Sequence, residues 1–463
     1  MPILPPDGSR FEAQFPVVII GAGAAGLIAA LAARARGVEV LVIERDAVPR
    51  GSTSLSAGLI PAAGTQWQAA IGEADTPAQF ADDIMHKAHD TPDPELVRLV
   101  TAEVGPALEW LHTAHGLNFS LIRDFRYPGH SALRMHGLAS RSGLELVDAL
   151  RHAAELAGVD ILCNALVVAL IADGARIHGV VARRPDGGEE RIGCDALVLA
   201  CNGYGGNKTL IARHVPSMAD ALYFGHPGNQ GDALLWGEAL GAVTGDLSGH
   251  QGHGSVAHPA GILISWATIT EGGFQVNLAG ERFSNEASGY SEQGAHVLAQ
   301  AGGVVWTVFD SRIAAVARQF EDFRQAEAAG IVLQADDVAR LAVRMGVPAA
   351  ALARSFAEVE ALKNSGGTDV FGRQFTDVPA LSAPYCAIRV TGALFHTQGG
   401  LMVDEQARVK RVAGGVFANL YAAGGAACGV SGPNASGYLS GNGLLTAVAL
   451  GRVAGRSAAG MAA

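Results

Sequence analysis

A glycine-rich turn between two strongly apolar segments constrains the fold of this chain more than any other feature. Residues 17–20 form a short β-branched run, as expected for a strand that is buried on both faces. The sequence GAGAAG follows at residues 21–26 and opens an Ala-rich helical stretch that reaches about residue 36. A second apolar run covers residues 38–43. This order predicts a β-α-β unit, the building block of parallel α/β sheets.

The spacing G-x-G-x-x-G gives each glycine of this turn a separate role. Gly21 makes the turn, Gly23 lets a pyrophosphate approach the backbone, and Gly26 lets the helix pack on the strand. The helix N-terminus, which includes Ala25, offers N–H groups to phosphates. Glu44 ends the second strand, where an acid would hold a ribose hydroxyl. The segment therefore predicts dinucleotide binding, and a plain glycine-rich turn in an α/β protein is the alternative.

The same segment has a competing interpretation as a targeting or membrane sequence. Residues 15–33 are nearly all apolar, as in a signal peptide or a membrane helix. Arg10 is the sole basic residue ahead of them, and the glycines interrupt the helix that such a segment needs. We therefore expect no membrane span.

Composition excludes some functions and suggests a compartment. The 463 residues carry a net charge of −11 without a basic run, which does not fit a nucleic-acid-binding protein. Gly occurs 60 times, which indicates many tight turns and close backbone contacts. The cysteines form no C-x-x-C pair and are odd in number, so we expect a reducing, cytoplasmic compartment. They are Cys163, Cys194, Cys201, Cys386 and Cys428.

Two later segments repeat the pattern of a strand that ends in a glycine turn. One is residues 196–206, and the other is residues 420–425 near the C-terminus. Residues 226–385 differ, because they carry histidines, tryptophans and helical stretches. We therefore predict a Rossmann-type α/β nucleotide-binding domain in two parts, residues 1–225 and 386–463. An α+β substrate or capping domain, residues 226–385, is inserted between them.

Seven ordered motifs make the chain resemble the fumarate reductase/succinate dehydrogenase flavoprotein family over almost its full length. The motifs lie at residues 17–27 with Glu44, 51–58, 134–136, 231–232, 280–286, 396–400 and 421–424. The resemblance implies a glutathione-reductase-like FAD domain. No histidine stands near Gly51, where relatives carry covalent flavin, so FAD is expected to bind non-covalently. The implied FAD contacts are Gly21, Gly23, Ala25, Gly26, Glu44, Arg45, Ser52, Thr53, Ser56, Ala57, Gly58, Gly203, Asp232, Gly424, Gly425, Leu439, Gly443 and Leu444.

The chain departs from the family where substrate is bound. Fumarate reductases hold a dicarboxylate with two arginines, and the matching positions here are Tyr290 and Tyr438. The family histidines match His396 and His253. Gly425 replaces a glutamate that contacts the FAD ribitol in the family, which weakens one cofactor contact.

Tyrosines in these two places make the chain look like 3-ketosteroid Δ1-dehydrogenases and cyclohexanone-type dehydrogenases. This branch implies removal of a proton α to a ketone and of a β-hydride by flavin N5. Tyr290 would be the base, and Tyr438 with the amide of Gly441 or Gly443 would polarise the ketone oxygen. His253 or His396 would lower the tyrosine pKa, either by donating a hydrogen bond or by being protonated.

Several alternatives stay open at this stage. The chain could instead reduce or oxidise an (un)saturated carboxylic acid, and Arg134 would then replace the two arginines that hold the carboxylates in the family. It could also oxidise another substrate such as an amine. It could also be a non-catalytic FAD or electron-transfer subunit. Arg134 and His136 could close the substrate cavity or brace the flavin domain, whereas Arg282 with Glu286 is expected to be structural. The electron acceptor is open among a quinone, an electron-transfer protein and oxygen.

Overall fold

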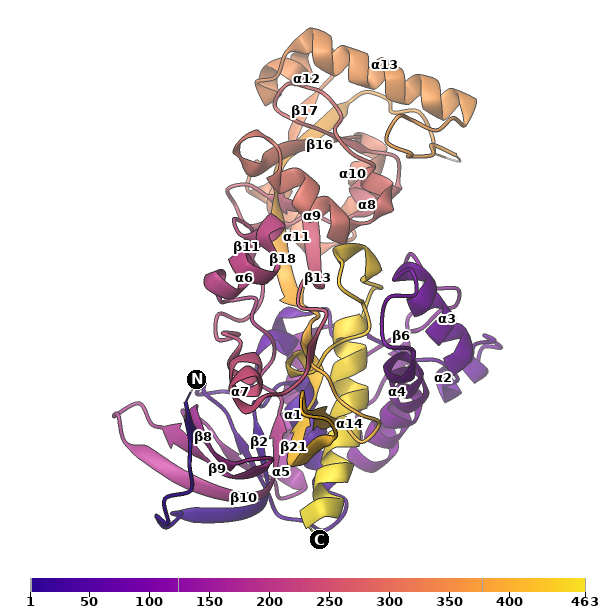
Figure 1. Cartoon of the computed structure of the whole chain (residues 1–463). Coiled ribbons are helices and arrows are strands. Elements are labelled where there is room, and N and C mark those ends of the chain that lie inside the picture. The colour runs from indigo at the N-terminus through magenta and orange to yellow at the C-terminus, as the bar shows by residue number, and fades with distance from the viewer. Residues whose placement is uncertain (1, 124, 377, 463) are drawn as a thin grey trace. The chain divides into compact units, whose positions relative to one another are not determined.

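The computed structural model describes residues 2–123, 125–376 and 378–462 (Figure 1). The chain forms two compact units. The first contains residues up to 210, residues 225–250 and residues from 396 onward; the second contains residues 211–224 and 251–395. No helix within the described residues is both long and apolar enough to cross a bilayer.

The first unit is built on a mixed sheet in the order β1-β8-β9-β10-β2-β3-β7, with β21 paired to β10 and β20 paired to β21. Its strands are β1 (Ile3–Leu4), β2 (Ala13–Ile20), β3 (Val40–Ile43), β7 (Asp160–Leu162), β8 (Leu166–Asp173), β9 (Arg176–Arg183), β10 (Glu189–Leu199), β20 (Arg408–Lys410) and β21 (Val416–Ala422). The parallel neighbours β10, β2 and β3 lie at its centre.

The predicted β-α-β unit is confirmed. Strand β2 pairs in parallel with β3, with Val17 opposite Val40 and Ile20 opposite Ile43. Helix α1 (Ala24–Arg34) connects the two strands and is buried over nearly its full length. Helix α1 is apolar on all sides because one side packs on the sheet and another packs against a second helix.

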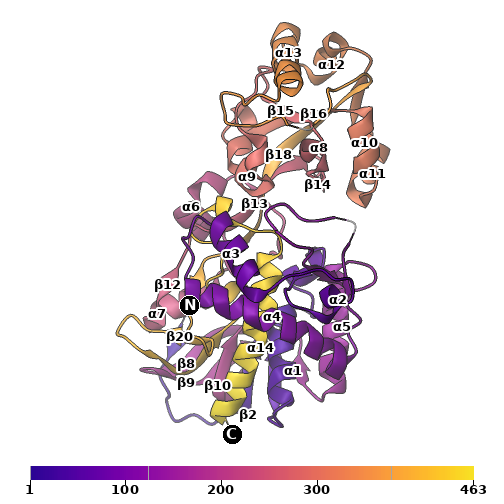
Figure 2. The ribbon, with the colours of Figure 1, turned by 90° about the vertical axis from the view of Figure 1, so that its right-hand side faces the viewer.

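That second helix is α14 (Asn442–Ala462), which runs beside α1 (Figure 2). Two glycines of α14 allow this close approach. A Cβ on Gly451 would lie 2.7 Å from the carbonyl oxygen of Ala25, and one on Gly455 would lie 2.1 Å from that of Ala29. The C-terminal segment is thus packed against the helix that follows the glycine turn.

Further helices and two small sheets complete the first unit. Residues 77–115 contain two separate helices, because Asp93 caps a new helix that starts at Pro94. The helices are α2 (Gln66–Ala69), α3 (Pro77–Lys87), α4 (Pro94–His115), α5 (Gly143–Leu156) and α7 (Asp232–Leu240). The small sheets contain β4 (Ile60–Pro61), β5 (Ser120–Leu121) and β6 (Met135–Gly137), and β12 (Thr244–Gly245) with β19 (Gly400–Leu401).

The second unit has its own core around β16 and β18, and α12 lies near β17 within it (Figure 1). Its strand order is β14-β13-β18-β16-β15, with β11 and β17 also paired to β18. The strands are β11 (Leu222–Tyr223), β13 (His250–Ala257), β14 (Ile262–Leu263), β15 (Phe274–Val276), β16 (Val304–Asp310), β17 (Leu333–Ala335) and β18 (Tyr385–Thr397). The helices are α8 (Ala267–Thr270), α9 (Tyr290–Leu298), α10 (Ser311–Ala317), α11 (Glu321–Ala328), α12 (Val338–Met345) and α13 (Ala349–Ser365), and α6 (Lys208–His214) spans residue 210.

The limits of the units differ from the boundaries at 226 and 385 that the sequence suggested. Residues 225–250 lie in the first unit because α7 packs on β19, where a Cβ on Gly237 would lie 2.2 Å from the Leu401 side chain. Residues 385–395 lie in the second unit because β18 pairs with β16 over its first seven residues. The change in composition at 226 therefore precedes the structural boundary.

Candidate active site

The turn at residues 21–26 has the geometry of a phosphate cradle. Gly21 has φ +103°, and a Cβ there would lie 2.6 Å from the carbonyl oxygen of Ala200. A Cβ on Gly26 would lie 1.8 Å from the carbonyl oxygen of Gly21. Helix α1 is N-capped by Gly23, which has no side chain, and its first turn carries no acidic residue. The helix terminus therefore suits the pyrophosphate of FAD.

Glu44 and Arg45 fix the edge of this cradle. The buried carboxylate of Glu44 accepts hydrogen bonds from the N–H of Ala22 at 2.9 Å and from that of Asp46 at 3.0 Å. Each oxygen keeps acceptor capacity, so a ribose hydroxyl can still donate to it. The Arg45 guanidinium donates to the carbonyl of Gly228 at 2.7 Å, which ties the loop before α7 to the end of β3.

The serine- and threonine-rich segment after Gly51 is held by its hydroxyls. Thr53 accepts a hydrogen bond from the N–H of Ala24, at the start of α1, at 3.0 Å. Ser52 accepts from the side-chain amide of Asn229 at 2.8 Å. Ser56 donates to the carbonyl of Thr53, and the N–H of Gly58 donates to Ser56. Ala57 lies between them, so this stretch is anchored to the cradle, as expected for a segment lining a bound flavin.

The remaining predicted FAD contacts also lie in the first unit. Asp232 begins α7, and burial raises the pKa of its carboxyl. A Cβ on Gly203 would lie 2.2 Å from the Thr397 hydroxyl, and one on Gly425 would lie 2.2 Å from Oδ1 of Asn202. The other contacts are Gly424 with φ +59°, buried Leu439, Gly443, and Leu444 at the start of α14.

His396 and Tyr438 meet in the first unit. Their rings contact edge to face, with centroids 5.4 Å apart and an interplanar angle of 73°. His396 lies near the end of β18, and Tyr438 precedes the loop with Gly441 that leads into α14. A Cβ on Gly443 would lie 3.0 Å from the imidazole of His396, so glycine is needed there for the ring to sit against α14.

A chain of hydrogen bonds that the sequence did not reveal sets the orientation of His396. The side-chain amide of Asn442 donates to Ser431 at 2.9 Å, and the Ser431 hydroxyl donates to Oε1 of Gln398 at 2.7 Å. Nε2 of Gln398 lies 3.0 Å from Nδ1 of His396. Because an amide nitrogen only donates, Nδ1 accepts and the imidazole proton lies on Nε2. Gln398 is the variable residue of the H-T-x-G-G motif, which is why the motif did not point to it.

His253 and Tyr290 meet in the second unit. Their rings are stacked, with centroids 5.1 Å apart and planes inclined by 24°. Tyr290 is the first residue of α9, and His253 lies on β13. The N–H of Ser255 donates to Nδ1 of His253 at 3.1 Å, so this imidazole also carries its proton on Nε2.

Aromatic side chains surround this histidine. Trp266 contacts it edge to face at 5.5 Å between centroids, and Phe395 lies at 5.7 Å. Trp266 is thus part of the ring cluster, whereas Trp236 and Trp306 are buried core residues.

Burial holds both histidines neutral. Loss of solvent lowers the pKa of His253 to about 3 and that of His396 to about 4. Burial thus favours the neutral form of both imidazoles near neutral pH over the protonated form that could lower the pKa of a catalytic tyrosine. Donation of a hydrogen bond from Nε2 is the role that remains.

Arg134 is not a substrate clamp. Its side chain is buried, and it donates to Asp75 at 2.8 Å and also to Asp83. His136 lies 2.9 Å from the Thr65 hydroxyl and 2.7 Å from the carbonyl of Arg134. Both residues brace the first unit, so Arg134 cannot replace the missing family arginine without breaking its ion pairs with the buried carboxylate of Asp75 and the partly exposed one of Asp83.

The second buried arginine cluster is structural as well, as the sequence suggested. Arg282 pairs with Glu286 at 2.7 Å and with Asp369, and Arg373 pairs with the same Glu286 at 3.0 Å. These arginines hold the pKa of Glu286 below its usual value despite complete burial. Among the described residues, no group of three or more His, Cys, Asp or Glu side chains is placed to hold a metal ion.

The fold, the glycine cradle and the relatives described below define an FAD-dependent oxidoreductase. The chain belongs to the FAD-binding flavoprotein family whose model, described as "FAD binding domain", matches residues 16–444. This confirms the resemblance to fumarate reductase and succinate dehydrogenase flavoproteins and the α/β class of the fold.

The similar proteins include both fumarate reductases and a 3-oxosteroid dehydrogenase. The chain is 32% identical to the probable fumarate reductase Ifc3 of Shewanella frigidimarina, over 96% of this chain and 74% of the relative. It is 24% identical to the 3-oxosteroid 1-dehydrogenase of Mycobacterium tuberculosis, over 90% of this chain and 94% of the relative. The open conformation of a flavocytochrome c3 fumarate reductase superposes with a TM-score of 0.83 at 30% identity, covering 98% of this chain and 80% of that structure.

Proposed function

We propose that this protein is an FAD-dependent dehydrogenase that introduces a C=C bond α,β to a ketone of the cyclic-ketone or 3-ketosteroid class. One observation carries the proposal. At the two positions that match substrate arginines of the family, the chain has Tyr290 and Tyr438, each packed on a buried neutral histidine. Phenol and imidazole groups of this kind recognise a neutral ketone far better than a dicarboxylate.

In the proposed reaction each of the two tyrosines has a different role. The Tyr438 hydroxyl, with the N–H of Gly441 or Gly443, donates to the ketone oxygen and makes the α-proton acidic. Tyr290, as its phenolate, then removes that proton and becomes the neutral phenol. Bound non-covalently, FAD supplies the acceptor for the β-hydrogen, which leaves as hydride.

The histidines position the phenols rather than supply charge. His253 covers one face of the Tyr290 ring and thereby limits its rotation. His396 contacts Tyr438 and is itself fixed by Gln398 and packed against Gly443. A base and a donor held by packed neighbours need little reorganisation when substrate binds.

A second candidate function is reduction of an unsaturated carboxylic acid or oxidation of its saturated form. The 32% identity to a probable fumarate reductase favours it. Against it, the arginine that could have replaced the clamp, Arg134, is committed to Asp75 and Asp83. A dicarboxylate bound by phenols alone would leave its charges without guanidinium partners.

A substrate panel distinguishes the two functions. Purified FAD-loaded protein is mixed with a redox dye as electron acceptor and with cyclohexanone, a saturated 3-ketosteroid or succinate. The proposal expects dye reduction with at least one ketone and none with succinate. In the reverse direction, protein reduced by dithionite would not be reoxidised by fumarate under anaerobic conditions. Turnover of succinate and fumarate without turnover of any ketone would establish the second function instead.

A further inference from the structure

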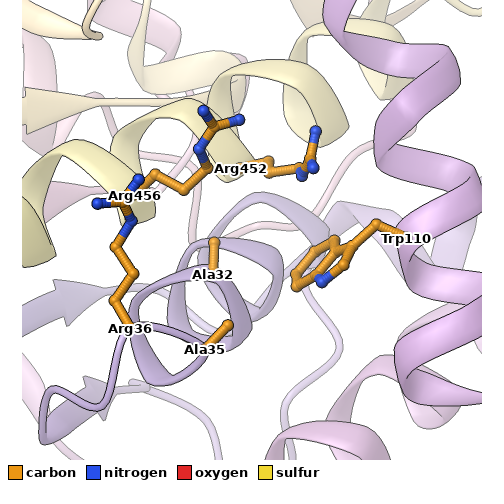
Figure 3. Close-up of a pocket in the computed structure, with 6 residues that line it drawn as sticks. All are labelled: Ala32, Ala35, Arg36, Trp110, Arg452 and Arg456. Atoms are coloured by element: carbon orange, nitrogen blue, oxygen red, sulfur yellow. The ribbon is translucent and has the colours of Figure 1, made fainter.

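Three arginines and one tryptophan line a pocket of about 150 Å³ in the first unit (Figure 3). Arg452 and Arg456 come from α14, Arg36 follows α1, and Trp110 comes from α4. Ala32 and Ala35 complete the lining. None of these residues belongs to the FAD cradle or to the histidine–tyrosine pairs, so the pocket has no part in the reaction proposed above.

The helix packing places these charges together. Gly451 and Gly455 bring α14 against Ala25 and Ala29 of α1. Arg452 and Arg456 each follow one of these glycines and are four residues apart, so they project from the same side of α14. Arg36 lies just beyond the end of α1 and reaches the same place (Figure 3).

The positive charge of the pocket is only partly neutralised. Glu103 of α4 accepts hydrogen bonds from Arg452 at 2.5 Å and from Arg456 at 3.1 Å. Two guanidinium groups therefore share one carboxylate, and the guanidinium of Arg36 adds a third positive charge to the lining of the pocket. Like charges four residues apart on a helix repel each other, so Arg452 and Arg456 destabilise the folded state. A bound anion would reduce this repulsion.

One of the guanidiniums is already held in place. Arg452 stacks over the Trp110 ring, 5.3 Å from its centroid, and is 17% exposed, whereas Arg456 is 45% exposed. A guanidinium with its plane fixed by an aromatic ring loses less entropy when it binds a planar or tetrahedral anion.

We propose that this pocket binds a compact multivalent anion, namely a pyrophosphate-like or a di- or tricarboxylate group. Its volume is well below the roughly 300 Å³ at which pockets for larger organic ligands begin, so it suits a compact group. Guanidinium groups bind both phosphate and carboxylate oxygens in paired hydrogen bonds, so a pyrophosphate-like anion and a di- or tricarboxylate would be recognised in the same way.

Isothermal titration calorimetry on the FAD-saturated protein tests the proposal, because saturation occupies the phosphate cradle at α1. Pyrophosphate and citrate are the probes, and acetate is the monovalent control. We expect saturable binding of pyrophosphate, citrate or both, with one site per chain, and the preferred probe identifies the source of the anion. Arg36→Gln and Arg456→Gln should each weaken binding about tenfold or more, as expected for loss of a charge-assisted hydrogen-bond partner.

Arg354→Gln is the matched control, since it removes an exposed arginine from α13 in the other unit. It should leave the affinity unchanged. FAD content and melting temperature confirm that each variant is folded. Three results would overturn the proposal: no saturable binding of either probe, equal affinity in Arg36→Gln, Arg456→Gln and Arg354→Gln, or acetate binding as tight as that of the multivalent anions.

Discussion

The imidazole of His253 lies face to face with the phenol of Tyr290, at 5.1 Å between ring centroids. Burial keeps this imidazole uncharged, and Ser255 fixes its tautomer. The contact therefore holds the proposed base in place without adding positive charge beside it. A site of this kind suits a neutral substrate and differs from one built to clamp carboxylates.

Replacement of Tyr290 tests the assignment of the base. Tyr290→Phe keeps the ring that stacks on His253 but removes the hydroxyl, so turnover of the ketone should fall by about 10²–10⁴-fold. FAD content should not change, because Tyr290 lies outside the cradle. Tyr385→Phe, in the same unit at an edge contact with Phe356, is the control and should retain activity. Retained turnover in Tyr290→Phe would remove this residue from the base role.

Gly26→Ala tests the phosphate cradle. The added Cβ would lie 1.8 Å from a backbone oxygen, so the start of α1 has to shift and FAD binding should be lost. Gly460→Ala is a matched control in a helix, since a Cβ there has no atom within 4 Å. The flavin-to-protein absorbance ratio after purification measures the difference. Equal FAD content in both variants would contradict the assignment of the cradle.

A double-mutant cycle tests the hydrogen-bond chain behind His396. Gln398→Leu removes the donor to Nδ1 and should lower kcat about tenfold or more, with FAD content unchanged. If Gln398 acts through His396, the double variant Gln398→Leu/His396→Gln should be no slower than His396→Gln alone. Additive losses would show that Gln398 acts independently, for example through Ser431 and Asn442.

Acid should destabilise the protein through its buried histidines. The pKa values of His130, His136 and His396 are lowered to about 4, and that of His253 to about 3, in each case chiefly by burial. Between pH 6.5 and about 4 the unfolded chain binds protons that the folded chain does not. Stability is therefore complete above pH 6.5 and is lost as the pH falls toward 4.

Unfolding by urea at several pH values measures this loss. Each such histidine contributes a slope of about 1.4 kcal/mol per pH unit within that window. His396→Gln should reduce the slope by about one proton. A slope unaffected by His396→Gln would mean that this imidazole is charged in the folded protein.

The parts of the fold that could be predicted are those that depend on local sequence. The run from Val17 to Glu44 contains both strands, the helix and all three glycines of the cradle, so its structure follows from residue spacing. The helix break at Pro94 is local as well, but the sequence pattern alone did not separate α3 from α4.

Contacts between distant residues could not be predicted. The ion pairs of Arg134 depend on Asp75 and Asp83, which the sequence does not mark as its partners. The charge state of His253 and His396 depends on how completely the fold excludes water from them, and residue type does not reveal this. The pairing of each tyrosine with its histidine is likewise a property of the tertiary structure.

Ketone desaturation is measured most simply by mixing the FAD-loaded protein with a saturated cyclic ketone without oxygen. We expect flavin absorbance to be lost in one turnover and the α,β-unsaturated ketone to form in equal amount, and Tyr290→Phe should slow both by about 10²–10⁴-fold. Fumarate should not restore the absorbance afterwards. Retention of flavin absorbance with every cyclic and steroid ketone, together with reoxidation of the reduced protein by fumarate, would show that the protein is not a ketone dehydrogenase.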